Sequence, residues 1–109
     1  MYARVMIGQV KPEQTDKMDN AIRVYGESIL PEARQQQGFT NAFLLTNPRT
    51  GKAMSITFWE TEDDMRESEA SAYYQEQIAR IASFMAGPGV VDHYQLSAWG
   101  TSDVAVDKA

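Results

Sequence analysis

The chain has 109 residues and is acidic, with ten Lys and Arg against 15 Asp and Glu and a formal charge of −5. Nucleic acids and anionic membranes require clustered basic side chains, so this balance argues against both as the main partner. The chain has no Cys and one His, which excludes disulfides, thiolate nucleophiles, iron–sulfur clusters and a His-rich metal site within one chain.

The first part of the chain predicts a strand followed by a long helix. Tyr2 to Val10 is rich in β-branched and aliphatic residues, and Pro12 interrupts it. The helix starts at Pro12 or Thr15, and Pro31 ends or kinks it, with a further turn or two before Gly38. Its apolar stripe recurs at intervals of three and four residues, at Met18, Ala21, Ile22, Tyr25 and Ile29.

Two strands joined by a turn come next. Phe39 to Thr46 and Lys52 to Glu60 have the composition of strands, and Asn47 to Gly51 between them is a cluster of turn residues. A connection of five residues predicts that the two strands pair antiparallel.

A second helical region and a last strand complete the chain. Thr61 is a good N-cap, the helix bends near Ser68 to Ser71, and Gly87-Pro88-Gly89 ends it. Val90 to Trp99 then alternates as a strand. The apolar stripe of the helix consists of Tyr74, Ile78, Ile81, Ala82 and Met85.

The order β-α-β-β-α-β predicts an α+β, ferredoxin-like fold, with one antiparallel sheet and both helices on a single face. Residues 1–99 form this domain and residues 100–109 a tail. The strands are apolar on both faces, whereas two helices cover only one. An apolar sheet face of this extent indicates an interface, so we predict a homodimer whose sheets pack face to face. No signal peptide or membrane span is visible, and the expected location is cytoplasmic.

Aromatic side chains are the candidate ligand contacts. Aromatic groups that converge between helices and sheet, with a few polar points, form the usual small-molecule pocket. Plain packing in the core is the alternative for each of them. We take Trp59 and Tyr74 as candidate catalytic residues, and the candidate substrate-binding residues are Tyr25, Tyr73 and Phe58.

His93 is the candidate general base, because a lone His can serve as a general base near neutral pH. It can equally be a surface or interface residue. The acidic run from Glu60 to Glu69 lacks the loop and glycine spacing of a calcium site and is typical of a solvated helix start, so no metal is expected.

Three stretches resemble the antibiotic biosynthesis monooxygenase (ABM) family, of the dimeric α+β barrel superfamily. They are Ala3 to Pro12, Gln37-Gly38-Phe39 before an apolar strand, and Ser55 to Asp64 followed by Glu69 to Tyr74. The resemblance covers about residues 2–98 and implies a homodimeric barrel with a pocket between sheet and helices in each subunit. Some members oxidise polycyclic aromatic compounds with dioxygen and neither metal nor flavin.

We therefore expect a cofactor-independent monooxygenase that acts on an aromatic or quinone-like molecule. The alternative is a non-catalytic small-molecule-binding or stress-related dimer with the same fold. Haem-degrading members use a His that corresponds to Ile78 here, so the resemblance disfavours that activity.

Overall fold

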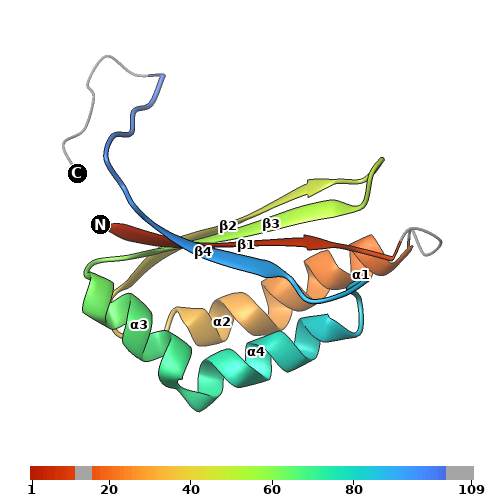
Figure 1. Cartoon of the computed structure of the whole chain (residues 1–109), viewed down its shortest axis with the longest axis horizontal. Coiled ribbons are helices and arrows are strands. Elements are labelled where there is room, and N and C mark those ends of the chain that lie inside the picture. Colours follow the sequence, from red (N-terminus) through yellow and green to blue (C-terminus); the bar gives the residue numbers. More distant parts are fainter. Residues whose placement is uncertain (12–15, 103–109) are drawn as a thin grey trace.

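The computed structural model describes residues 1–11 and 16–102, and these form one antiparallel sheet with helices on a single face (Figure 1). The sheet order is β2-β3-β1-β4. The predicted α+β, ferredoxin-like fold is confirmed. The strands are β1 (Tyr2–Gln9), β2 (Phe39–Asn47), β3 (Lys52–Trp59) and β4 (Val90–Gln95).

The first helical region consists of α1 (Asp16–Val24), the π-helix η1 (Tyr25–Ile29) and α2 (Leu30–Ala33). Pro31 lies in the first turn of α2, where its missing N–H costs little. The turn before it widens, and the Leu30 N–H reaches back to the Tyr25 carbonyl. The helix is therefore distorted before Pro31 and continues through it, while the predicted starts at Pro12 and Thr15 lie outside the described residues.

The second helical region is divided into α3 (Glu62–Ala70) and α4 (Ala72–Ala82). The Thr61 hydroxyl accepts a hydrogen bond from the Asp64 N–H at 3.0 Å, which confirms the predicted N-cap. Ser71 has extended backbone angles and separates the two helices. The bend predicted near Ser68 to Ser71 is therefore present. The break lets α3 cross the end of the sheet while α4 runs along it (Figure 1).

Two predicted boundaries are wrong. The helix α4 ends at Ala82, before Gly87-Pro88-Gly89, because the chain turns there to pair with the end of β1: Met85 forms a bridge with Val10, and the Ala86 N–H donates to the Gln9 carbonyl at 2.7 Å. The strand β4 ends at Gln95 rather than Trp99, since β1, its pairing partner, begins at Tyr2.

The core lies between the sheet and the helices. Trp59 and Met65 are the largest fully buried side chains, and they lie where α3 meets the ends of β1 and β3. Phe39 packs against the Trp59 ring edge to face at 5.7 Å between centroids. This end of the sheet is packed solid, whereas a cavity opens farther along the helices.

The opposite face of the sheet carries apolar side chains that nothing in the described chain covers. Strand register places Ile7, Met54, Leu45 and Val90 in one row across the four strands. Leu45 is 53% exposed and Val90 is 68% exposed. We call this surface the open face. Its large side chains are Val5, Ile7, Phe43, Leu45, Met54, Ile56, Phe58, Val90 and Tyr94.

Candidate functional site

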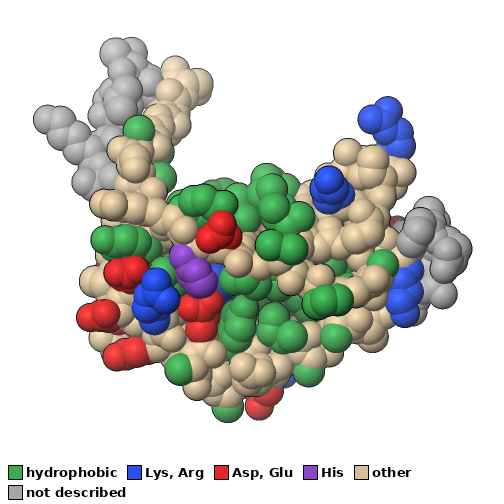
Figure 2. Space-filling model, viewed as in Figure 1, with side chains coloured by type: hydrophobic (Ala, Val, Ile, Leu, Met, Phe, Trp, Pro, Cys, Tyr) green, Lys and Arg blue, Asp and Glu red, His purple; other side chains and the backbone are tan. Residues whose placement is uncertain are grey.

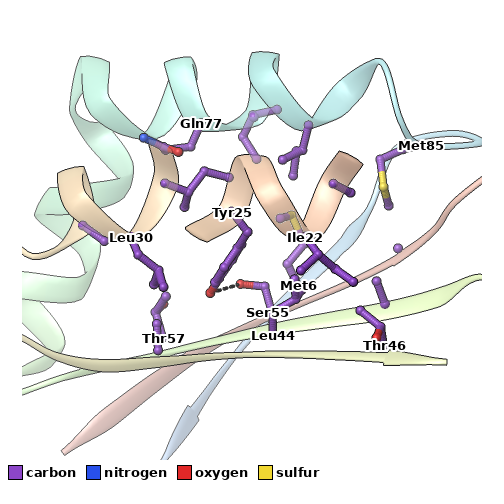
Figure 3. Close-up of a pocket in the computed structure, with 18 of the residues that line it drawn as sticks. Met6, Ile22, Tyr25, Leu30, Leu44, Thr46, Ser55, Thr57, Gln77 and Met85 are labelled. Atoms are coloured by element: carbon purple, nitrogen blue, oxygen red, sulfur yellow. Dashed lines mark hydrogen bonds between the residues drawn. The ribbon is translucent and has the colours of Figure 1, made fainter. Parts of the chain in front are cut away.

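The cavity lies between the helix-facing side of the sheet and the helices α1, η1, α2 and α4 (Figure 3). Its volume is about 100 Å³. Most of its lining is apolar, and three methionines contribute flexible side chains, Met6, Met18 and Met85. Ligand pockets usually measure about 300–1,000 Å³, so a ligand of two or three rings requires these side chains to move.

Tyr25 crosses the cavity from η1 to the sheet (Figure 3). Its hydroxyl shares a hydrogen bond of 3.1 Å with the Ser55 hydroxyl and lies 3.5 Å from the Phe43 carbonyl oxygen. Burial raises the pKa of the Tyr25 phenol, and the Ser55 hydrogen bond only partly opposes this. Burial likewise raises the pKa of Tyr73 and of Tyr74, so at neutral pH all three cavity tyrosines are protonated donors.

Arg4 brings a cation to the cavity wall from the middle of β1, and only 6% of the residue is exposed. One terminal nitrogen, Nη1, donates to the Ser68 hydroxyl at 3.0 Å and to the Met65 carbonyl at 3.4 Å. The guanidinium carbon lies 4.7 Å from the centroid of the Tyr74 ring and 5.2 Å from that of Trp59. Burial lowers the pKa of Arg4, although its guanidinium stays charged at any physiological pH.

Gln77 is the polar group on the α4 side of the cavity. Its amide nitrogen donates to a Glu32 carboxylate oxygen at 2.6 Å, and Arg80 pairs with the other oxygen of Glu32 at 3.0 Å. The residue is 6% exposed, and its amide oxygen has no hydrogen-bond partner among the described residues. Glu32 fixes the nitrogen, while the oxygen is itself buried, so a donor in the cavity reaches it only when neighbouring side chains move.

The structure brings together some of the predicted site residues. Tyr25, Tyr73 and Tyr74 line the cavity. Trp59 does not line it: the side chain is fully buried, and it contacts two residues that do, Thr57, whose hydroxyl accepts from the indole N–H at 3.0 Å, and Arg4.

Phe58 and His93 lie elsewhere. The placement of Phe58 in the pocket is wrong, because strand alternation puts its ring on the open face, where it packs edge to face against Phe43 at 6.0 Å. His93 faces the helices beside Arg4 in the register, but its Nε2 contacts a Glu69 carboxylate oxygen at 2.7 Å and the side chain is not part of the cavity wall. Figure 2 shows the histidine (purple) beside acidic side chains, next to a band of apolar ones.

The sequence carried signals for the two polar residues that were missed. Arg4 interrupts an otherwise aliphatic strand at a position that alternates inward with Met6. Gln77 lies on the apolar stripe of α4, three residues after Tyr74 and four before Ile81. A polar side chain at an inward position is the informative exception to a hydrophobic pattern.

The described part of the chain holds no cluster of three or more His, Asp or Glu side chains that could bind a metal ion. The acidic residues of α3 instead surround a helix start, where Arg66 pairs with Glu62 at 3.1 Å. Among the described residues, no helix is both long and apolar enough to cross a membrane.

No family model matches the chain, and no curated protein matches it in sequence. Solved structures do match. A monooxygenase of Streptomyces coelicolor, solved in complex with the ligand Nanaomycin D, has a TM-score of 0.79 at 14% identity and covers 94% of this chain and 92% of its own. A "putative antibiotic biosynthesis monooxygenase" of Nitrosomonas europaea has a TM-score of 0.65 at 20% identity, over 87% of this chain and 97% of its own. A protein of the same description from Bordetella bronchiseptica has a TM-score of 0.70 at 19% identity, and the match covers 88% of this chain and 96% of its own. Identities this low show a shared fold, and the fold is that of the ABM-like proteins.

Proposed function

We propose that the chain is an ABM-type monooxygenase that oxidises an aromatic or quinone-like small molecule in the cavity. One observation carries the proposal: a mostly apolar cavity into which Arg4, Tyr25 and Gln77 bring polar groups from three different elements. The fold supports it, because monooxygenases are among the structural neighbours and one of them was solved with Nanaomycin D bound.

The reaction needs no electron donor from the protein, since the substrate supplies the electrons that reduce dioxygen. An anthrone-like methylene between two aromatic rings loses a proton to give an electron-rich anion, which reacts with dioxygen. One oxygen atom forms the new carbonyl and the other leaves as water with the two methylene hydrogens, so that R₂CH₂ + O₂ gives R₂C=O + H₂O. The protein contributes an apolar enclosure, orientation and hydrogen bonds to the developing oxygen anion.

The cavity residues divide into two roles under this proposal. Tyr25, Tyr73 and Tyr74 contact the substrate rings and donate hydrogen bonds, because burial keeps their phenols protonated. Trp59 supports the site from outside by packing on Arg4. His93 acts as the base only if it leaves Glu69, to which its Nε2 is bonded.

The test is oxygen uptake with anthrone and 1,4-naphthohydroquinone as substrates, using protein dialysed against chelator and free of flavin absorbance. We expect uptake above the autoxidation rate, one ¹⁸O atom from ¹⁸O₂ in the anthrone product, and a loss of most activity in Tyr25→Phe. His93→Gln isolates the base: unchanged turnover means that the substrate loses its proton without this residue.

Binding without turnover would overturn the proposal. If anthrone binds, as measured by quenching of tryptophan fluorescence, but uptake equals that of heat-denatured protein, the chain is a small-molecule-binding protein. Binding without uptake in the wild-type protein, and not only in the variants, would show that the missing activity is not caused by a substitution.

We further propose that the functional unit is a homodimer joined through the open face. The exposed Ile7, Phe43, Leu45, Val90 and Tyr94 support this, because an apolar surface on this scale marks an interface.

A further inference from the structure

Arg4 is a buried cation for which the described part of the chain provides no carboxylate within ion-pair distance. The ion pairs of the described residues join Arg66 to Glu62, Arg80 to Glu32 and His93 to Glu69, and none includes Arg4. Taking a charge out of water without a partner is costly, so buried cations are normally paired. With 6% of the residue exposed, Arg4 departs from that rule.

The contacts of Arg4 hold the guanidinium in place without an ion pair, because the Glu69 carboxylate attracts it only from beyond ion-pair distance and is bonded to His93. The Met65 carbonyl and the Ser68 hydroxyl are neutral acceptors, and both contact the same nitrogen, Nη1. The rings of Trp59 and Tyr74 add cation–π attraction and fix the plane of the group. Nε and Nη2 contact no acceptor among the described residues, and Arg4 belongs to the cavity wall.

We infer that Arg4 is the anion-recognition residue of this cavity, and that the cavity selects the ionised form of an acidic hydroxyaromatic compound, a phenolate or the enolate of a hydroxyquinone. Such a ligand fits both features of the site: its rings suit the apolar wall, and its oxygen anion supplies the contacting ion-pair partner that Arg4 lacks among the described residues. The inference names the ionic form of the substrate in the proposed function and rests on it.

This assignment removes the need for a general base at neutral pH. A cation in an enclosure of low dielectric lowers the pKa of a bound phenol, so the proton leaves to solvent as the ligand binds. The location of His93 outside the cavity wall is then no obstacle to catalysis.

A matched pair of probes tests the inference without turnover. The first is 2-hydroxy-1,4-naphthoquinone, which is ionised at neutral pH, and the second is its methyl ether, which has nearly the same size and no charge. In the wild-type protein at pH 7 we expect the hydroxyquinone to bind at least about tenfold more tightly, from the value of a hydrogen bond to a charged group. Equal affinity of the two probes in the wild-type protein overturns the inference.

Variants locate the preference. Arg4→Met keeps an unbranched side chain of similar length and should abolish the preference, while Arg4→Lys should retain part of it, because lysine keeps the charge but lacks the planar fork. Arg66→Met removes the same charge from an exposed helix position and is the matched control. A loss of preference in Arg66→Met equal to that in Arg4→Met would assign it to net charge and refute a role of Arg4.

A second readout separates ligand recognition from a structural role. The pKa of bound 1-naphthol, followed by its absorbance, should lie below that of free 1-naphthol in the wild type and should return toward the free value in Arg4→Met. An unchanged pKa of the bound naphthol in the wild type contradicts the inference. Neither assay measures oxygen uptake. If the cavity selects anions but no substrate is turned over, the inference about Arg4 holds and the proposed monooxygenase activity is refuted.

Discussion

Buried polar groups on the helix side of the sheet are the most informative residues of this chain. Arg4 and Gln77 are two of them, and Ser68, which accepts from Arg4, is the third. The nitrogen of the Gln77 amide is anchored by Glu32, and its oxygen has no partner among the described residues. A buried acceptor without a donor costs about 1–3 kcal/mol of folding free energy. Leucine in the same place would avoid that cost, which makes the Gln77 amide a candidate ligand contact.

Replacing Gln77 by leucine separates these two roles. We expect Gln77→Leu to change the free energy of unfolding by less than about 1 kcal/mol, because the lost bond to Glu32 is offset by removal of the unsatisfied oxygen. Arg80 keeps Glu32 paired in the variant. Affinity for hydroxynaphthoquinones should fall by roughly tenfold, as expected for the loss of one hydrogen bond to the ligand. Urea denaturation and fluorescence titration measure the two quantities.

Gln75→Leu is the control for this experiment, since residue 75 is exposed on the same helix. Wild-type affinity in Gln77→Leu would show that the amide oxygen serves no ligand.

At the residue scale the sequence predicts periodic positions well and exceptions poorly. Tyr25 and Tyr74 lie on helical stripes, and both were correctly placed toward the cavity. Phe58 and Trp59 are adjacent in one strand, so alternation forbids both from facing the helices, and only Trp59 does. Arg4 was missed because a single charged residue does not alter the strand pattern around it.

At the scale of the elements, the cavity depends on two irregularities of the helical regions, the π-turn before Pro31 and the end of α4 at Ala82. The π-turn before Pro31 begins at Tyr25 and projects this side chain to Ser55 on β3. The end of α4 at Ala82 lets Met85 reach β1, where it pairs with Val10. The distortion before Pro31 is readable from the sequence because proline lacks an N–H, whereas the early end of α4 depends on pairing with a distant strand.

Met85 closes one end of the cavity (Figure 3), and its removal should enlarge the site. A Cβ on Gly8 would overlap the Met85 methyl group, so this thioether lies directly over the β1 backbone. We expect Met85→Ala to shift the affinity ratio toward 9,10-anthraquinone over 1,4-naphthoquinone by several-fold. The variant should lose about 1–2 kcal/mol of stability, less than a fully buried methionine would cost, since Met85 is only half-buried.

Met54→Ala is the control for Met85→Ala because it removes the same atoms from the open face, outside the cavity. An unchanged affinity ratio in Met85→Ala would mean that this side chain does not limit the size of the ligand.

At the scale of the whole molecule, one face of the sheet is covered and the other is not. The sequence predicts one covered and one uncovered sheet face, since the strands are apolar on both faces and the two helical regions cover one of them. The segment 96–102 leads away from β4 on the side opposite the helices (Figure 1), and its Trp99 is 39% exposed. Covering the open face takes a surface outside the single chain, and a second copy of the chain is the one that we propose.

Charged residues placed on the open face, in the edge strand β2, test that proposal. We expect wild-type protein at micromolar concentration to sediment at twice the chain mass of 12.2 kDa, and the double variant Phe43→Glu/Leu45→Glu to sediment near 12.2 kDa, because a carboxylate in an apolar interface loses its hydration without a partner. Both side chains are about half exposed in the single chain, at 48% and 53%, so their replacement leaves the helix-facing core intact. Thr40→Glu/Gln75→Glu adds the same charge at exposed polar positions and should remain dimeric. A wild-type mass near 12.2 kDa would refute the homodimer, whatever the behaviour of the variants.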